Sequence, residues 1–365
     1  MIVFLNFAPI DFMGGAEKWM LSISELVNKK EPTILIDVSS NISNIYGGIV
    51  LGRSFTRERV NTNVKRITLS YRSFLPWTKS YKEVTKVFKE CRLIYFRYEL
   101  QEALILLFFG RIISFKKSVA GFHSPFMYND PISVLDHIHN IVYTSFLSRK
   151  VLKTLKKIHV LNISDKNTLK NKYHLNNVLF IPNGIIIDPA RVLKKPNADK
   201  LHVLFMGELS TRKGIDKVQE IIRRVGESIQ FHIAGDGPKE NEIKRLANEV
   251  RNLNYYGRLD RKGIRKVLAR CDLLLFPSRA ESMSLTVLEC MSYGLYILDS
   301  TFTSLNLPNY IEKSILKNNV EEYIKQLNEF SSQKKVIDRK RIANYCQRTF
   351  PQNKINNILE KKLFN

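Results

Sequence analysis

The segment 277–299, PSRAESMSLTVLECMSYGLYILD, constrains the fold of the chain more than any other. The apolar run 273–276 before it is typical of a buried parallel strand. After a polar turn, apolar residues recur at helical spacing over 285–292. Gly294 is placed to end this helix, and 296–298 predict the next strand. The segment therefore predicts a βαβ unit.

Two carboxylates lie on this unit eight positions apart. Glu281 stands in the turn before the helix and Glu289 about one and a half turns into it, so both can face the crevice where open α/β sheets bind ligands. The amides of Met283, Ser284 and Leu285 are the unpaired donors at the helix start. This pairing suits a ligand with a sugar at one end and phosphate at the other. The alternative interpretation is that Glu281 is a solvated loop residue and Glu289 a surface residue of the helix.

Strands and helices alternate in both halves of the chain. The predicted strands are 1–6, 34–38, 93–98, 118–122, 158–161, 178–181, 202–206, 231–234, 253–256, 273–276 and 296–298. The predicted helices are 16–27, 81–89, 102–109, 141–157, 215–225, 239–249, 261–270 and 285–292. The polar segment 42–70 is expected to form loops with short strands. The alternation predicts an α/β protein of two doubly wound, Rossmann-like domains facing across a cleft.

The length of 365 residues exceeds what one core usually supports, so two domains are expected. We predict an N-terminal domain over 1–183, a linker rich in lysine and proline over 184–199, and a C-terminal domain over 200–350. The segment 351–365 has the apolar spacing of an amphipathic helix and is expected to return to the N-terminal domain.

Two features of the first half are candidate ligand contacts. Gly14 and Gly15 separate the first strand from the first helix, which lets backbone amides approach a phosphate, although a tight turn would need the same residues. His123 follows the strand 118–122 at its carboxyl end. A lone histidine is more often structural than catalytic.

The charge balance is strongly basic, with 58 Lys and Arg against 34 Asp and Glu and a formal net charge of +24. This predicts attraction to nucleic acid, acidic lipid or phosphorylated substrates. The basic residues are spread over both halves without an aromatic recognition motif or zinc spacing, which argues against nucleic acid. The predicted helix 141–157 carries Arg149, Lys150, Lys153, Lys156 and Lys157, and is either a solvated face or a contact with an anionic bilayer.

The cellular location is also predicted. The four cysteines are far apart and show neither metal-ligand nor disulfide spacing, as expected in a reducing cytosol. The segment 1–6 is typical of a strand rather than a signal peptide, and the longest apolar run, 103–109, is too short to span a bilayer. We expect a cytoplasmic protein, soluble or peripheral on the inner face of the cell membrane.

A series of motifs then resembles a known family. In order they are GGAE, AGFHSPF, IPNGI, GELSTRKG, IAGDGP, YGRL and FPSRAESMSLTVLECMSYG. This order is similar to the retaining, nucleotide-sugar-dependent glycosyltransferases of the two-domain GT-B fold, family GT4. The resemblance covers nearly the whole chain, and it is diffuse in the first domain and specific in the second.

The resemblance implies roles for individual residues. Glu281 would contact the donor sugar, Glu289 the nucleotide ribose, and Lys213 with Arg212 the diphosphate. His123 would lie beside the reacting sugar. Further donor contacts are implied for Gly14 and Gly15 near the phosphates, for Met283, Ser284 and Leu285 through their amides, and for Arg258 and Leu259 near the base.

The implied reaction moves a sugar from a nucleotide sugar, such as a UDP- or GDP-sugar, to a hydroxyl of a glycan or lipid-linked acceptor. The chain contains no Asp-x-Asp pair, so metal-independent transfer without a cofactor is expected, with retention at the anomeric carbon. One departure is Glu208, which stands where the family commonly has an arginine. An inactive relative acting as a binding or partner subunit, a nucleic-acid-binding protein and a sugar-nucleotide epimerase are the alternative interpretations.

Overall fold

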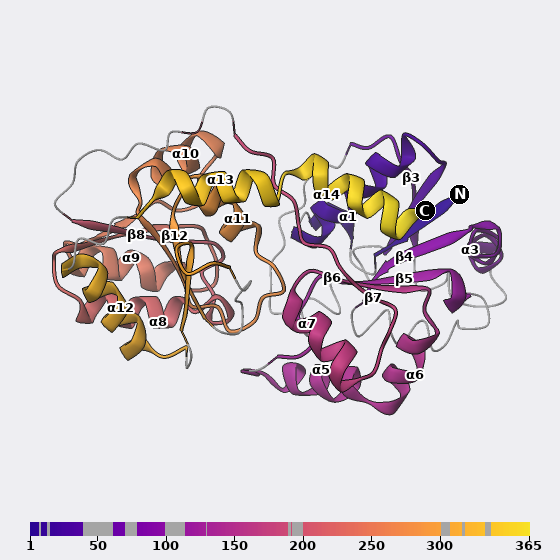
Figure 1. Ribbon diagram of the computed structural model, residues 1–365, viewed down its shortest axis with the longest axis horizontal. Helices are drawn as coiled ribbons and strands as arrows, with labels where there is room; N and C mark the ends of the chain where they lie inside the picture. Colours follow the sequence, from indigo (N-terminus) through magenta and orange to yellow (C-terminus); the bar gives the residue numbers. More distant parts are fainter. Residues whose placement is uncertain are drawn as a thin grey trace. The chain divides into compact units, whose positions relative to one another are not determined.

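The computed structural model describes residues 1–6, 9–12, 15–38, 61–69, 79–98, 114–128, 130–188, 191, 200–300, 307–315, 318–332 and 337–365. These residues form two compact units (Figure 1). The first comprises Met1–Met127, Ser133–Pro182 and Asn356–Asn365, and the second Tyr128–Ile132 and Asn183–Ile355. The predicted elements at 42–60, 70 and 102–109, the linker residues 189–190 and 192–199, and Gly14 lie outside the described residues.

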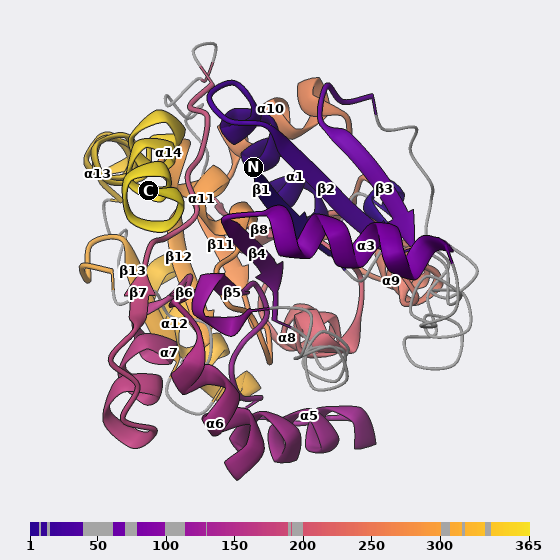
Figure 2. The same cartoon turned by 90° about the vertical axis from the view of Figure 1, so that its right-hand side faces the viewer.

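The first unit is built on a parallel sheet of order β3-β2-β1-β4-β5-β6-β7. Its strands are β1 (Ile2–Leu5), β2 (Thr33–Val38), β3 (Lys65–Leu69), β4 (Leu93–Arg97), β5 (Ser118–Phe122), β6 (Lys157–Val160) and β7 (Val178–Phe180). Its helices are η1 (Ile10–Phe12), α1 (Gly15–Asn28), α3 (Lys79–Glu90), η4 (Phe115–Lys117), α5 (Val134–Thr144), α6 (Phe146–Thr154), α7 (Ile163–Asn167) and the π-helical turn η5 (Thr168–Lys172). The central strands are apolar on both faces because helices cover both sides of the sheet (Figure 2).

The second unit has a parallel sheet of order β10-β9-β8-β11-β12-β13. Its strands are β8 (Leu201–Met206), β9 (Ile229–Ala234), β10 (Leu253–Tyr255), β11 (Leu273–Phe276), β12 (Tyr296–Ser300) and β13 (Glu312–Ile315). Its helices are η6 (Thr211–Lys213), α8 (Ile215–Arg224), α9 (Glu240–Glu249), α10 (Arg261–Arg270), α11 (Leu285–Ser292), α12 (Val320–Ser332) and α13 (Arg339–Thr349). The predicted α/β class is confirmed: both units are Rossmann-like parallel α/β layers.

The single helix predicted over 141–157 is wrong. The chain forms α5 and α6 instead, and Lys157 already belongs to β6. The break lies at Ser145, whose backbone is extended and whose hydroxyl accepts a hydrogen bond from the Ser148 amide at 3.1 Å. A serine that caps a new helix stabilises the break more than continuation of the first helix would.

The C-terminal segment contributes to both units. Helix α14 (Gln352–Leu359) continues into the π-helical turn η7 (Glu360–Phe364), and residues from Asn356 onward cluster with the first unit. There the Phe364 ring lies 5.4 Å from Phe4, and the Phe364 carbonyl accepts a hydrogen bond from Arg92 at 2.6 Å. The last residues of the chain are therefore part of the first unit's core.

Candidate donor site

The strand order in the sheet of the second unit reverses between the neighbouring parallel strands β8 and β11. Strand order runs outward from this pair to β9 on one side and β12 on the other, so the loops after β8 and β11 diverge at one point of the sheet edge. Open parallel sheets bind ligands at such a switch point. The loop after β8, residues 207–214, is called the basic loop here, and the turn after β11, residues 277–284, the acid turn.

The switch point brings Lys213 and Glu281 together. The Lys213 ammonium donates a hydrogen bond to Glu281 Oε2, and both side chains are mostly buried, at 17% and 16% exposed. The ammonium also lies 5.8 Å from the centre of the Phe276 ring. Burial raises the pKa of Glu281, but Lys213 and Arg212 outweigh it, so the pKa lies below its ordinary value. The carboxylate is therefore ionised and can accept hydrogen bonds.

Gly214 makes this approach possible. Its φ is +78°, in the left-handed region, and a Cβ there would lie 2.2 Å from the carbonyl oxygen of Pro277. Any other residue would push the basic loop away from the acid turn, and Lys213 with it.

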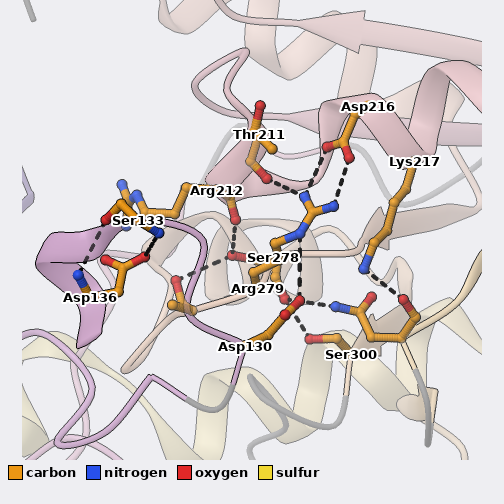
Figure 3. A network of polar contacts seen from close by, with 12 residues as sticks. Asp130, Ser133, Asp136, Thr211, Arg212, Asp216, Lys217, Ser278, Arg279 and Ser300 are labelled. Carbon is orange, nitrogen blue, oxygen red and sulfur yellow. Dashed lines mark hydrogen bonds and ion pairs between the residues drawn. The ribbon is translucent and has the colours of Figure 1, made fainter. Parts of the chain in front are cut away.

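Arg279 ties the two loops together (Figure 3). Its guanidinium donates to both oxygens of Asp216 at 2.9 and 2.7 Å and to the carbonyl of Thr211, and its amide donates to the Arg212 carbonyl at 3.0 Å. Asp130 lies 3.5 Å away as a further anion. A bidentate pair of this kind fixes geometry as well as adding energy. Arg279 thus holds the backbone on either side of Arg212.

Glu208, which departs from the family pattern, lies in the same loop. Its carboxylate lies 3.5 Å from the Arg212 guanidinium and accepts a hydrogen bond from Ser210 at 3.2 Å. Part of the positive charge of Arg212 is therefore already balanced by the chain itself.

Helix α11 begins at Leu285 with Ser284 as its N-cap. The amides of its first turn have no intrahelical partner, as at every helix start. The turn before it is held by Asn183, whose amide group donates to the Met283 carbonyl at 3.2 Å. The predicted amide donors Met283, Ser284 and Leu285 thus lie at the start of the helix that carries Glu289.

Glu289 lies half-buried on α11. Burial and the neighbouring Asp188 raise its pKa above the ordinary value, and Arg261 acts in the opposite direction. Asp188 itself accepts from Arg265 and from the Tyr293 hydroxyl at 3.3 Å. Glu289 therefore has a second carboxylate nearby.

The looser assignments, Arg258 and Leu259, lie in the loop after the edge strand β10. Arg258 and Leu259 follow β10 and precede α10, whose N-cap Asp260 accepts from the Gly263 amide at 2.7 Å. Arg258 is exposed, while Leu259 is half-buried against Gly263. Both lie at the same edge of the second sheet as the basic loop, because β10 is parallel to its neighbours.

His123 belongs to the first unit, where it follows β5 as predicted. Its Nε2 lies 3.0 Å from the Tyr95 hydroxyl, and this hydroxyl lies 2.9 Å from His159 Nδ1. The His159 Nε2 lies 2.9 Å from the Ile181 carbonyl, which can only accept. His159 Nε2 therefore carries hydrogen, Tyr95 donates to His159, and His123 Nε2 donates to Tyr95. In neutral His123 this leaves Nδ1 as an acceptor.

The neighbours of His123 define its charge state. Burial, His159 and Arg97 hold its pKa well below the ordinary value, and burial lowers the pKa of His159 to about 4. The Trp19 ring lies 4.5 Å from the His123 ring. His123 is thus a neutral, oriented imidazole at neutral pH.

The glycine loop of the first unit is described only in part. Gly15 is the first residue of α1, its φ is not positive and a Cβ there would meet nothing within 4 Å, so neither a left-handed turn nor close packing requires glycine at this position. Glu17 of the same motif pairs with Arg97 at 2.5 Å. Gly14 lies outside the described residues.

Sequence reasoning missed Arg279, Asn183, Asp188 and Tyr95 as parts of these sites. Arg279 and Asn183 stand inside motifs that carry the family resemblance, so position gave a signal for them. Tyr95 gave no such signal. The structure shows why glycine stands at position 121, two residues before His123: a Cβ there would lie 1.9 Å from the Tyr95 hydroxyl. Within the described residues there is no cluster of three or more His, Cys, Asp or Glu arranged to hold a metal ion.

Solved structures share this fold over the whole chain. The computed structure matches sucrose-phosphate synthase from Thermosynechococcus elongatus with a TM-score of 0.74 at 14% identity, covering 100% of this chain and 99% of that one. It matches Anabaena HepE, solved with UDP and glucose, with a TM-score of 0.70 at 14% identity over 100% and 99% of the two chains. Identity this low establishes the fold alone. The fold is GT-B, with two Rossmann-like parallel-sheet units.

Sequence comparison finds a family match within the second unit. Residues 188–349 match the family model Glycosyl transferases group 1. A related protein is the phosphatidylinositol N-acetylglucosaminyltransferase gpi3 subunit of Schizosaccharomyces pombe, 27% identical over 173 residues, which is 43% of this chain and 37% of the relative. The chain matches between 37% and 51% of the length of the first curated relatives. The part matched by the family model contains the basic loop and the acid turn.

Proposed function

We propose that this protein is a retaining glycosyltransferase of family GT4, transferring a hexose from a nucleotide sugar such as a UDP- or GDP-sugar. The observation that carries the proposal is the buried Lys213–Glu281 pair at the switch point of a unit that matches the glycosyl transferases group 1 model. A cation beside an ionised acid can bind phosphate and sugar hydroxyl together.

The residues have different proposed roles. Lys213 and Arg212, with the α11 amides, stabilise the leaving nucleoside diphosphate, which gains charge as the glycosidic bond breaks. Glu281 accepts a hydrogen bond from the sugar being transferred, and Glu289 from the ribose. For His123, in the first unit, the proposal keeps the role that the family resemblance implies, in which its Nδ1 lone pair accepts from a sugar hydroxyl.

The proposed mechanism is metal-independent with retention at the anomeric carbon. Support comes from the sequence, which lacks an Asp-x-Asp pair, and from a cationic loop that can neutralise a diphosphate. In this mechanism the acceptor hydroxyl attacks from the face that the diphosphate leaves. The departing phosphate oxygen is the base nearest to the acceptor proton.

The acceptor is proposed to be a hydroxyl of a glycan or of a lipid-linked sugar, reached at the inner face of the cell membrane by a cytoplasmic, peripheral protein. The net charge of +24 favours an anionic surface or substrate. No helix in the described part of the chain is both long and apolar enough to cross a bilayer.

One observation favours a second candidate, a binding or partner subunit without transfer activity. Glu208 stands in the basic loop and contacts Arg212, which reduces the positive charge available to a diphosphate. Among the relatives, the yeast protein is itself described as a subunit.

The test begins with a thermal-shift screen of UDP- and GDP-sugars. A donor at a hundred times its dissociation constant should stabilise the chain by roughly 2.7 kcal/mol. Release of the nucleoside diphosphate, the anomeric configuration of the product and the effect of EDTA are then measured with the donor that binds. Donor binding without transfer to any glycan or lipid-linked acceptor would favour the partner subunit. Loss of transfer in EDTA would exclude the metal-free mechanism.

A further inference from the structure

Most exposed large apolar side chains of the described residues lie in one short stretch. All but Ile186 and Leu285 fall within 132–147. On α5 and the start of α6 they are Val134, Ile138, Ile141, Phe146 and Leu147, with Val134 75%, Ile141 69% and Phe146 79% exposed. A single exposed apolar residue is ordinary, but a contiguous group on adjacent helices marks an interaction surface.

Helix periodicity places the three exposed residues of α5 on one face. Val134, Ile138 and Ile141 are spaced by four and three positions and share one face of α5. Helices α5 and α6 contact each other, and both ribbon views place them side by side (Figures 1 and 2). Phe146 is the first residue of α6, directly after the break at Ser145. We call these five exposed side chains, on two helices that contact each other, the α5–α6 surface.

Exposed lysines adjoin the α5–α6 surface. Lys150 and Lys153 follow Phe146 by four and seven positions, so they lie on its face of α6, and both are exposed. Two other basic residues nearby differ: Arg149 lies over the Tyr173 ring at 5.0 Å, and Lys157 donates to the Lys362 carbonyl. Helix α6 carries no acidic residue. Positive charge and apolar exposure therefore coincide on one face of α6.

We propose that the α5–α6 surface inserts into the interface of an anionic lipid bilayer, with Phe146 and Ile141 among the acyl chains and Lys150 and Lys153 at the headgroups. Short amphipathic helices with aromatic or aliphatic residues beside lysines bind membranes in this way, and long lysine side chains reach the headgroups from an apolar surface. A protein partner of equal apolarity would not need the flanking lysines. This inference rests on the membrane location in the proposed function and specifies which surface binds the bilayer. It holds whether or not the protein transfers a sugar.

The test is flotation of the full chain with vesicles of phosphatidylcholine, alone or mixed with phosphatidylglycerol. The parent should float with the anionic vesicles only, and less so as NaCl rises from about 0.05 to about 0.5 M. Phe146→Ser with Ile141→Ser should lower the partition coefficient by about tenfold or more. Lys150→Gln and Lys153→Gln should lower it by about fivefold each.

Matched controls distinguish binding through this surface from nonspecific binding of exposed apolar or basic residues elsewhere. Ile186→Ser removes an equally exposed apolar side chain from the second unit, and Lys82→Gln with Lys89→Gln removes two exposed lysines from α3. Both should float like the parent, and all variants should keep the parent's thermal midpoint because the replaced side chains are exposed. Equal loss in the controls would overturn the proposal. So would absence of lipid binding together with a dimer, seen by ultracentrifugation, that Phe146→Ser dissociates.

Discussion

The Lys213–Glu281 pair permits the sharpest prediction. In Lys213→Ala the ammonium disappears, while Arg279 still holds the backbone of the basic loop through Thr211 and Arg212. The change therefore removes one charge without releasing the loop. Its effect on transfer measures what that charge does for the leaving diphosphate.

The magnitude follows from the burial of the pair. A unit charge about 4 Å from a phosphate oxygen contributes roughly 4 kcal/mol at an effective dielectric constant of about 20. Removing one preorganised donor from a developing oxyanion costs roughly 2.7 to 4 kcal/mol, or about 10² to 10³ in kcat. Because Lys213 is only 17% exposed, solvent screening reduces this little. We expect kcat to fall by about 10² to 10³ and KM for the donor to rise much less.

The assay is steady-state release of nucleoside diphosphate, with donor binding measured separately by calorimetry. Lys244→Ala is the matched control, since Lys244 is exposed and pairs with Glu240 at 2.7 Å in the same unit. It should leave both constants within about twofold of the parent, as expected for a surface pair. If kcat of Lys213→Ala also stayed within threefold of the parent, about 0.7 kcal/mol by the tenfold rule, Lys213 would not meet the leaving group.

Four further predictions concern the loops, the pH dependence and the C-terminus. Arg279→Lys loses the bidentate hydrogen bonds to Asp216, which hold the basic loop in place. The kcat/KM for the donor should therefore fall about tenfold, and proteolysis of the basic loop should accelerate. Glu208→Gln should lower the Kd of the nucleotide several-fold, most at low salt, because it releases Arg212; an unchanged Kd would show that the pairing is inconsequential. Burial lowers the pKa of His159 to about 4 in the folded chain, from 6.5 in the unfolded chain. The free energy of unfolding should therefore decrease by roughly 3 kcal/mol as the pH falls from 6.5 to 4, because only the unfolded chain binds the proton there. Urea unfolding of His159→Gln should lack that part of the pH dependence. Leu363→Ala should destabilise the first unit by about 2 to 5 kcal/mol in chemical denaturation, since this side chain is fully buried there, whereas unaltered unfolding would mean that the C-terminus does not support that core.

The helices and strands of the second unit could be predicted closely from local pattern. The helix Arg261–Arg270 and the strand Leu273–Phe276 have the bounds expected from periodicity and turn residues. The first unit was predicted less well where a polar residue competes with helix continuation, as at Ser145. Strand β13 and helices α12 and α13 were not predicted, although Pro308-Asn309 before β13 and Asn318-Asn319 before α12 are turn signals.

The sequence by itself determined which chemistry the second unit can carry, because the acid turn, the basic loop and the glycine that joins them are local motifs. Only the tertiary structure decided which groups meet. Strand order depends on crossover connections between distant segments, and it puts β8 beside β11, so that Lys213 reaches an acid 68 positions away. The same holds for Tyr95 between two histidines and for the apolar face of α5. Whether a side chain is covered depends on packing, and periodicity alone cannot tell a face that contacts the core from one that faces outward.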